Sequence, residues 1–339
     1  MSQRSEWAEP GAFQVAPGVH RIPLPLPSDG LRAVNVYALH SDQDLVLVDG
    51  GWALEESRRQ LETALKEIGF GLADITRFLV THVHRDHYTQ AVAVRREFGT
   101  RVSLGIGERE TLEMLTGPRL PDESPQLEKL IVCGAEPLIA RMRAIWQEGG
   151  HATNEWEMPD DWIDGRTALP LGGRELLAVP TPGHTRGHLV FADLADGLLF
   201  AGDHVLPHIT PSIGFESAPA ASPLGSYLRS LKLVRQLPDL RLLPAHGPVT
   251  DSVHARVDAL LEHHAERLDA CAAAVAAGSG TAYETARALT WTRRGRHFDD
   301  LDVFNQMLAT TETHAHLEVL VAQGRLRGHA DDGVTTYAE

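Results

Sequence analysis

Four side chains that can bind metal ions lie within six residues of one another, directly after an apolar run. The run Phe78–Val80 is followed by His82, His84, Asp86 and His87. A short apolar run of this kind is consistent with a buried strand, which would deliver the polar residues in a loop at a sheet edge. Two imidazoles, an aspartate and a third imidazole at this spacing cannot easily reach one ion, but they can serve two neighbouring ions. The spacing therefore predicts a dinuclear metal site.

The rest of the chain offers further ligands in matching places. Each stands just past a hydrophobic, strand-like run, in a short turn that contains glycine or proline. These residues are His184, Asp203 and His246. Because strands of one sheet system can end at the same edge, all seven side chains could meet there. The recurrence of the same local arrangement at four places makes a shared metal site a stronger hypothesis than a set of structural or surface histidines.

The order of these motifs resembles that of a known family. The chain reads H-x-H-x-D-H at 82–87, G-H-T-x-G-H at 183–188, Gly-Asp at 202–203 and His-Gly at 246–247. Over about residues 15 to 250 this pattern is similar to the metallo-β-lactamase superfamily of metal-dependent hydrolases. The resemblance implies an α/β fold, a four-layer αββα sandwich that binds its metals at one end of two packed sheets.

The resemblance also implies a role for each ligand. One metal would be held by three histidines, the other by an aspartate and two histidines, with Asp203 bridging the two ions. In that order the ligands are His82, His84 and His184, then Asp86, His87 and His246. Asp49, after the run Leu45–Val48, matches the family's supporting carboxylate. Imidazole and carboxylate ligands in this ratio suit two zinc ions, with iron or manganese as alternatives.

The expected chemistry is hydrolysis of a small ester, thioester or lactone, as in the similar hydroxyacylglutathione hydrolases and lactonases. Two divalent ions about 3.5–4 Å apart lower the pKa of a shared water, and the resulting bridging hydroxide attacks the substrate. Asp86 is expected to orient that hydroxide as well as bind metal. Asp203 stands where many true β-lactamases have cysteine, which disfavours antibiotic hydrolysis. The alternative is a phosphodiesterase or endoribonuclease of the same superfamily, since some members with a helical C-terminal domain cleave RNA.

Several other residues near the motifs are candidates for substrate contact or support. Tyr88 stands where many family members have a small residue, and its phenol is a hypothetical catalytic group for the oxyanion or substrate. His188 is expected to be structural. For His204 and His208, substrate contact and backbone contact remain equal alternatives. Five histidines of the last third are expected on exposed helix faces, namely His254, His263, His264, His314 and His316.

The periodicity of the chain predicts two parts. Residues 1–252 would form the catalytic domain, interrupted at about 106–165 by a helical insertion that caps the metals. Residues 253–339 would form a C-terminal, winged-helix-like helical subdomain, serving as a packing or dimerisation element, so that a homodimer is one expected assembly. Helices are expected over 88–98, 108–115, 126–133, 136–147, 224–237, 253–277 and 303–321, with one more starting at the capping box Thr281/Glu284.

Composition narrows the class of partner. The 339 residues carry 46 acidic against 31 basic side chains, which disfavours binding to nucleic acid or anionic membrane and favours a small-molecule substrate. No run of about 18 apolar residues suggests a membrane span. The two cysteines, Cys133 and Cys271, lie in apolar, helix-like stretches and do not suggest a disulfide framework. The first residues show no secretory signal pattern, so a cytoplasmic enzyme is expected.

Overall fold

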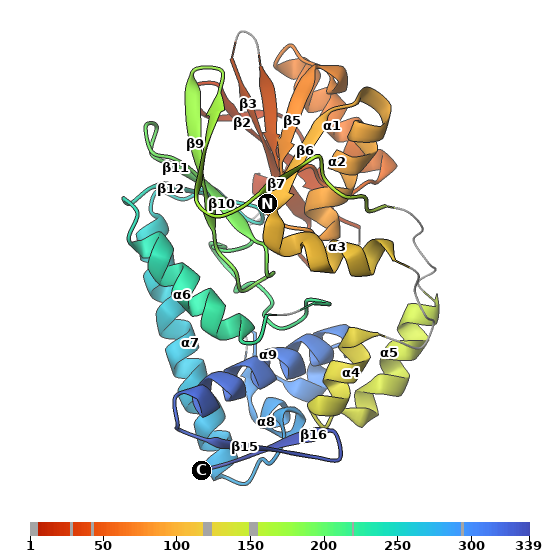
Figure 1. Cartoon of the computed structure of the whole chain (residues 1–339), viewed down its shortest axis with the longest axis vertical. Helices are drawn as coiled ribbons and strands as arrows, with labels where there is room; N and C mark the ends of the chain where they lie inside the picture. Colours follow the sequence, from red (N-terminus) through yellow and green to blue (C-terminus); the bar gives the residue numbers. More distant parts are fainter. Residues whose placement is uncertain are drawn as a thin grey trace.

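Two packed β-sheets form the upper half of the protein in Figure 1, and helices form most of the lower half. The computed structural model describes residues 6–27, 30–41, 44–117, 124–148, 155–218, 220–292 and 295–339. Among these described residues, no helix is both long enough and apolar enough to cross a membrane.

The first sheet contains seven strands, and their order in the sheet follows their order in the sequence. Neighbours from β1 to β4 pair antiparallel, whereas those from β4 to β7 pair parallel. The strands are β1 Phe13–Ala16, β2 Val19–Pro25, β3 Ala33–His40, β4 Leu45–Val48, β5 Ile75–Leu79, β6 Arg101–Gly105 and β7 Asp161–Ile163.

The second sheet contains five strands in the order β12-β11-β10-β9-β8, with only the β11–β12 pair parallel. Its strands are β8 Thr167–Leu171, β9 Arg174–Pro180, β10 Leu189–Asp193, β11 Leu198–Gly202 and β12 Arg241–Pro244. Two short hairpins lie outside both sheets: β13 Thr290–Trp291 with β14 Arg296–His297, and β15 Arg327–Asp331 with β16 Val334–Ala338.

The inner strands β3, β4, β10 and β11 are buried on both faces, which accounts for their continuous apolar runs. Successive side chains of a strand point to opposite faces, so in β10 Phe191 packs between the sheets while Val190 packs outward toward α6 (Pro223–Arg235). Between the sheets, the rings of Tyr37 and Phe200 meet edge to face with centroids 5.3 Å apart. Helices α1 (Glu55–Glu67) and α2 (Arg85–Phe98) cover the outer face of the first sheet. The expected αββα sandwich is therefore confirmed.

The expected helices are all present, with ends shifted by no more than three residues. Gly99 ends α2 in a left-handed conformation, φ 73°, as its position after an apolar helix predicts. Thr281 and Glu284 form the expected capping box. The remaining helices are α3 Arg109–Thr116, α4 Pro125–Val132, α5 Glu136–Glu148, α7 Val253–Ala276, α8 Ala282–Ala288 and α9 Val303–Ala322.

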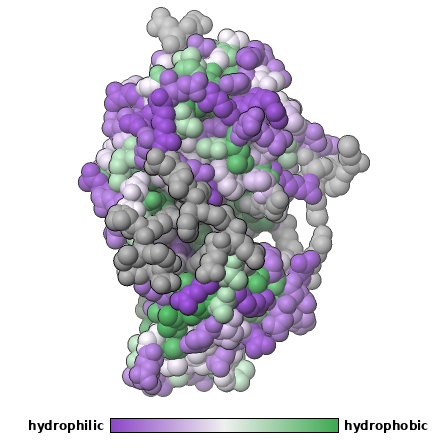
Figure 2. Space-filling view, turned by 90° about the vertical axis from the view of Figure 1, so that its right-hand side faces the viewer, coloured by the Kyte–Doolittle hydropathy of each residue, from purple (hydrophilic) through white to green (hydrophobic). Residues whose placement is uncertain are grey.

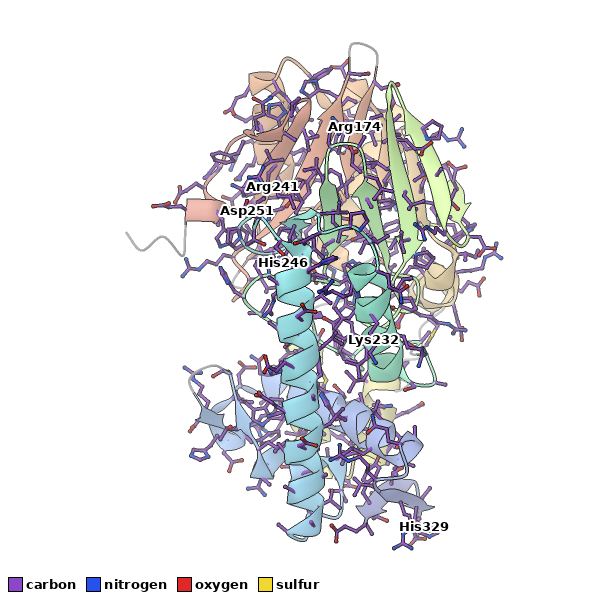
Figure 3. The ribbon with its side chains drawn as sticks, turned by 90° about the vertical axis from the view of Figure 1, so that its left-hand side faces the viewer. Arg174, Lys232, Arg241, His246, Asp251 and His329 are labelled. Carbon is purple, nitrogen blue, oxygen red and sulfur yellow. The ribbon has the colours of Figure 1, made fainter. Side chains whose placement is uncertain are left out.

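The lower half combines helices from two distant parts of the sequence. Leu130 of α4 and Met142 of α5 belong to the same apolar cluster as Val257 of α7 and Leu317 of α9. Helix α7 runs from the sandwich to the far end of the molecule, beginning near His246 (Figure 3). Part of the expected insertion thus shares its core with the C-terminal helices, while the domain boundaries and the capping role stay predictions. Both cysteines are buried and free.

The expected exposure of the C-terminal histidines is wrong for three of the five. His264 and His316 are fully buried and His314 is 6% exposed, whereas only His263 is exposed and His254 is half-buried. Helix α9 packs against α5, α6, α7 and α8, so its polar residues are enclosed on nearly every side. Because α9 is rich in Thr and His, its sequence does not indicate that it lies at the centre of the helical half.

On the face shown in Figure 2, hydrophilic side chains cover much of the upper half, with separate apolar patches below.

Candidate metal centre

Five of the seven predicted ligands stand in loops that follow strands, and the other two, Asp86 and His87, lie in the first turn of α2. The loop with His82 and His84 follows β5, and the turn with His184 follows β9. Asp203 comes directly after β11, and His246 comes shortly after β12. β5 belongs to the first sheet and the other three strands to the second. The loops meet at one end of the sandwich because the sheets pack face to face. The structure therefore brings together residues that are up to 164 positions apart in the sequence.

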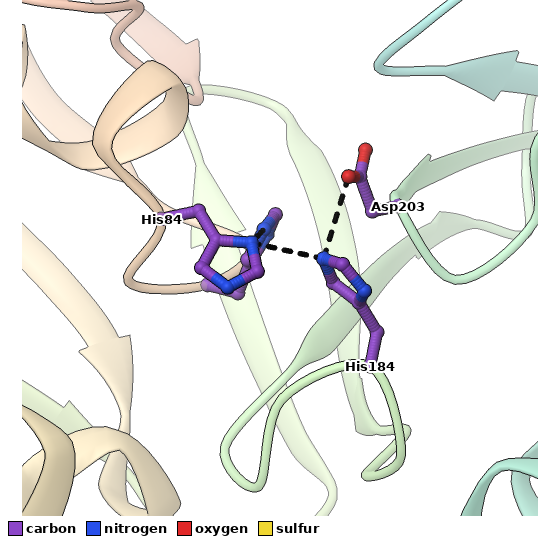
Figure 4. A group of neighbouring side chains, drawn as sticks. His84, His184 and Asp203 are labelled. Carbon is purple, nitrogen blue, oxygen red and sulfur yellow. Dashed lines mark hydrogen bonds and ion pairs between the residues drawn. The ribbon is translucent and has the colours of Figure 1, made fainter. Parts of the chain in front are cut away.

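The first group consists of three imidazoles and one carboxylate that lie within 4.8 Å of one another. His84 Nδ1 lies 3.0 Å from both His82 Nε2 and His184 Nε2. His184 Nε2 lies 3.4 Å from Asp203 Oδ2. Figure 4 shows His84, His184 and Asp203 converging from separate loops. Zinc–nitrogen bonds of about 2.0–2.1 Å in a tetrahedral site place ligand atoms about 3.3 Å apart, so these spacings fit a single ion.

The second group consists of Asp86, His87 and His246. His246 Nε2 lies 3.4 Å from Asp86 Oδ2 and 3.3 Å from Asp203 Oδ1, while His87 Nε2 lies 3.6 Å from each of these oxygens. Asp203 therefore faces the first group with Oδ2 and the second with Oδ1. One carboxylate lies between the two sets of imidazoles.

Hydrogen bonds at the far side of the rings fix which nitrogen faces the centre. His184 Nδ1 donates to the Ser212 carbonyl, and His246 Nδ1 donates to the Ala33 carbonyl, each over 2.8 Å. A donating Nδ1–H leaves Nε2 with its lone pair free. Outer hydrogen bonds of this kind commonly orient histidines that bind metals.

Asp49 supports the centre from beneath the first loop. Its Oδ2 accepts a hydrogen bond from His87 Nδ1 over 2.9 Å, and its Oδ1 accepts from the backbone N–H and hydroxyl of Thr81. The residue is 2% exposed and has φ 63°, a strained backbone conformation for a side chain other than glycine. Asp49 thus orients His87 and fixes the start of the ligand loop.

Gly202 has to be glycine because two polar side chains lie so close to it that no Cβ atom would fit. A Cβ atom at this position would lie 2.7 Å from Thr81 Oγ1 and 2.8 Å from His188 Nε2, and its φ is 50°. The Gly-Asp motif therefore combines a tight backbone approach with the shared carboxylate.

Three buried atoms of the site have no hydrogen-bond partner among the described residues, and all three face one another. They are His87 Nε2, His246 Nε2 and Asp203 Oδ1. Leaving a buried polar atom unpaired costs about 1–3 kcal/mol, so three such atoms aimed at one point indicate a missing positive partner. The residues present fit two divalent ions.

The charge states agree with this interpretation. Burial lowers the pKa of His84 to about 3 and that of His184 to about 4, which keeps both imidazoles neutral and able to bind a metal. Burial also lowers the pKa of His87, but Asp86, Asp49 and Asp203 outweigh it and raise that pKa to about 10. Without metal, the carboxylates of the second group therefore favour a proton on His87, which a metal ion would displace.

The remaining candidates lie outside both groups. His188 is fully buried; its Nδ1 lies 2.9 Å from Thr181 Oγ1, and its Nε2 accepts a hydrogen bond from the Asp203 backbone N–H. His204 is also fully buried, with its ring against Tyr227 at 5.2 Å between centroids, and His208 is exposed. His188 thus contacts Thr181 and the backbone of Asp203, and its structural role stays a prediction.

The catalytic role expected for Tyr88 is corrected by its surroundings. Its side chain is fully buried in the apolar cluster of the first sheet, and its hydroxyl donates to the Glu157 carbonyl over 2.7 Å. The phenol is thus held within the core by a main-chain acceptor. The sequence suggested a pocket residue because Tyr88 follows the ligand motif directly, but the first turn of α2 directs it inward.

Sequence reasoning missed the residues that hold the ligand loops. The carbonyls of Ser212 and Ala33 are main-chain groups and have no sequence signature. Thr185 lies inside the recognised G-H-T motif, yet its buried partner Glu108 lies in the predicted insertion, where an acidic residue is expected on the surface.

The chain belongs to the metallo-beta-lactamase superfamily, whose pattern matches residues 29–246. It is 23% identical to the "probable metallo-hydrolase YqjP" of Bacillus subtilis over 94% of both proteins. A second relative, "beta-lactamase-like protein 2 homolog" of Caenorhabditis elegans, is 25% identical over 70% of this chain and 63% of its own length.

Two further comparisons bear on fold and chemistry. The "atrochrysone carboxyl ACP thioesterase" of Aspergillus fumigatus is 24% identical over 72% of this chain, but this match spans only 44% of the thioesterase. The crystal structure of a metallo-beta-lactamase family protein from Thermus thermophilus is 26% identical, with a TM-score of 0.72 over 96% of this chain and 100% of that one. The likeness therefore extends through the lower helical half.

Proposed function

We propose that this protein is a dinuclear hydrolase of a small ester, thioester or lactone, with two zinc ions as its natural metals. Membership of a superfamily of metal-dependent hydrolases makes it an enzyme of that general class. The observation that carries the dinuclear proposal is the position of Asp203. Its two oxygens lie 3.4 Å from His184 Nε2 and 3.3 Å from His246 Nε2, between the two candidate ligand groups.

In this proposal the ligands divide into two sets that share Asp203: His82, His84 and His184 in one, Asp86, His87 and His246 in the other. When bound, two divalent ions supply an activated water near neutral pH and positive charge for the oxyanion of the substrate. In this proposal Asp86, whose side chain is 20% exposed, also orients the attacking water.

Several features support an acyl substrate. The G-H-T and Gly-Asp motifs resemble those of hydroxyacylglutathione hydrolases and lactonases, and one relative bears the name of an acyl carrier protein thioesterase. The excess of acidic side chains, 46 against 31, opposes a polyanionic substrate such as RNA. Aspartate rather than cysteine at position 203 sets the site apart from many antibiotic-degrading members.

A substrate panel tests this proposal. Acyl thioesters, lactones and bis(p-nitrophenyl) phosphate would be assayed with the metal-free protein, before and after addition of zinc. We expect zinc-dependent turnover, fastest for a thioester or lactone, and loss of that turnover in Asp203→Asn. Faster turnover of the phosphodiester would reverse the choice of substrate class. Metal analysis that finds a single iron would instead favour oxygenase chemistry.

We also propose that the C-terminal helices form a winged-helix-like unit that serves packing or dimerisation. A bridge between Thr281, at the start of α8, and Thr336 of the β15–β16 hairpin supports this arrangement. The net charge of −15 disfavours a role in reading DNA. Sedimentation of the purified protein, alone and with duplex DNA, would test both parts; a DNA complex would contradict the proposal.

A further inference from the structure

A buried carboxyl group lies between two of the loops that carry the candidate ligands. Glu108 follows β6 in a short 3-10 turn, Ile106–Glu108, and is fully buried. The Thr185 hydroxyl, one residue after His184, donates a hydrogen bond to Glu108 Oε1. An acidic side chain is almost never fully buried unless it is paired with another group.

The backbones on either side of this contact touch directly. A Cβ atom on Gly187 would overlap the Glu108 backbone nitrogen, and one on Gly105 would overlap the Gly187 carbonyl oxygen. A Cβ on Gly107 would lie 2.7 Å from the Arg186 carbonyl oxygen. The segment 105–108 therefore has no room to shift relative to the turn 183–188, and Glu108 is fixed against it.

Glu108 also lies near the first ligand loop. Burial and the neighbouring Glu216 raise its pKa to about 8. The Thr185 hydroxyl and the backbone N–H groups of Val83 and Gly187 partly oppose this rise, because they favour the charged form of the carboxyl group. Val83 lies between the candidate ligands His82 and His84. Glu108 therefore interacts with both ligand-bearing segments.

A second acidic residue holds the same turn from the other side. Glu216 is 9% exposed, and its Oε1 accepts hydrogen bonds from the Arg186 backbone N–H and the Thr111 hydroxyl, each over 3.0 Å. Glu216 lies four residues after Ser212, whose carbonyl orients His184. The turn with His184 is thus attached to two neighbouring segments through buried carboxyl groups.

We propose that Glu108 is a positioning residue that sets the spacing between the 82–84 loop and the 183–188 turn, and thereby between the three imidazoles of the first metal group. This inference rests on the proposed function, because it assumes that these imidazoles bind a metal ion. Glu108 acts through Thr185 and the backbone of both loops and does not itself bind metal.

The test compares Glu108→Ala with Glu108→Gln. The glutamine variant keeps a side-chain oxygen that accepts from Thr185 without the charge, whereas the alanine variant removes the group. A matched control is Glu110→Ala, since Glu110 is 57% exposed and forms an ion pair with Arg186 of the same turn. The zinc dissociation constant, by chelator competition, and the visible spectrum of the cobalt-substituted protein would be measured together with the melting temperature of the metal-free protein.

We expect Glu108→Ala to weaken zinc binding by about 10–100-fold, as loss of outer support to metal ligands does, and to change the cobalt spectrum. Glu108→Gln and Glu110→Ala should match the wild type in both readouts. Should Glu108→Ala fail to fold, Thr185→Val removes the same hydrogen bond and should weaken zinc binding in the same direction.

Three outcomes would overturn the proposal. Unchanged zinc affinity and cobalt spectrum in Glu108→Ala or Thr185→Val, with only a lower melting temperature, would make Glu108 a packing residue. Loss of zinc in Glu108→Gln equal to that in Glu108→Ala would show that acceptance of the Thr185 hydrogen bond does not position the turn. A wild-type protein that binds no zinc or cobalt would overturn the proposed function itself, and this inference with it.

Discussion

The sandwich end and the lower helical half both bury polar residues, but they satisfy them differently. In α9, the hydroxyls of Thr310 and Thr313 donate to carbonyls one turn earlier, and His316 Nδ1 donates to the Glu312 carbonyl. At the sandwich end, in contrast, buried atoms of His87, His246 and Asp203 lie without partners among the described residues and face one another. Buried polar groups that bond within their own helix serve the fold, whereas unpaired groups that converge from separate loops mark the site.

The distinction concerns arrangement, because the lower half has unpaired atoms too. His264 Nε2 and Arg267 Nη2 are buried there without partners in the described part of the chain. They do not join a group of three or more potential ligands, and the two such groups found in the described residues both lie at the sandwich end. Convergence on one point is the property that separates the two regions.

The largest effect should come from the residue shared by both groups. Asp203→Asn keeps the shape of the side chain but removes its charge, so we expect it to lower kcat/KM by more than about 100-fold, beyond the usual effect of an outer-shell change. Metal analysis should show less than two ions per chain. Full metal content and activity in this variant would remove the distinction between the two regions.

A smaller effect on metal binding is expected from a residue that supports a ligand without itself belonging to either ligand group. Thr81→Val removes the hydroxyl that donates to Asp49, which in turn accepts from His87 Nδ1. Because loss of outer support commonly costs about 10–100-fold in metal affinity or activity, zinc affinity should fall within that range while the fold persists. Thr313→Val in α9 is the matched control, and its zinc affinity should equal that of the wild type.

The lower half should instead respond to acid. Burial lowers the pKa of His264 to about 2, and burial also lowers the pKa of His314 and His316 to about 3. The unfolded chain binds protons on these residues near pH 6.5 while the folded chain does not. Their contribution to stability is therefore full above pH 6.5 and falls as the pH drops toward 3, by about 1.4 kcal/mol per histidine and pH unit.

Urea unfolding at pH 7.5 and 5.5 would measure this loss. In His316→Phe the difference in unfolding free energy between the two pH values should be smaller than in the wild type. An equal difference would show that His316 is protonated in the folded protein as readily as in the unfolded chain.

The smallest effect on catalysis is expected at Tyr88. Tyr88→Phe removes a hydrogen bond to the Glu157 carbonyl, which typically contributes about 1 kcal/mol to stability. We expect a slightly lower melting temperature and unchanged kcat and KM for the substrate identified by the panel. A marked loss of kcat would restore the catalytic role suggested by the sequence.

The sequence predicted the parts of this protein that have local patterns. The seven candidate ligands follow strand-like runs, and the helices show apolar periodicity and caps such as Gly99 and the Thr281/Glu284 box. The positions of the ligands after strands predicted that the loops converge, whereas the αββα sandwich was implied by the resemblance of the motifs to a known superfamily.

Features that depend on packing could not be read in this way. His264 and His316 become neighbours across α7 and α9, 52 residues apart, with His264 Nδ1 3.1 Å from His316 Nε2. Tyr88 lies next to the ligand motif but faces the core, because successive helix residues point in different directions. Glu108 is enclosed by a distant turn. In each case the side chain is buried by a segment that is distant in the sequence, and no local sequence pattern indicates that the two segments are in contact.

The most direct test is a crystal structure of the zinc-loaded protein with anomalous data at the zinc edge. The proposal predicts two peaks about 3.5–4 Å apart, one among His82, His84 and His184 and the other among Asp86, His87 and His246, with Asp203 touching both. One peak, or peaks away from these side chains, would contradict the dinuclear site.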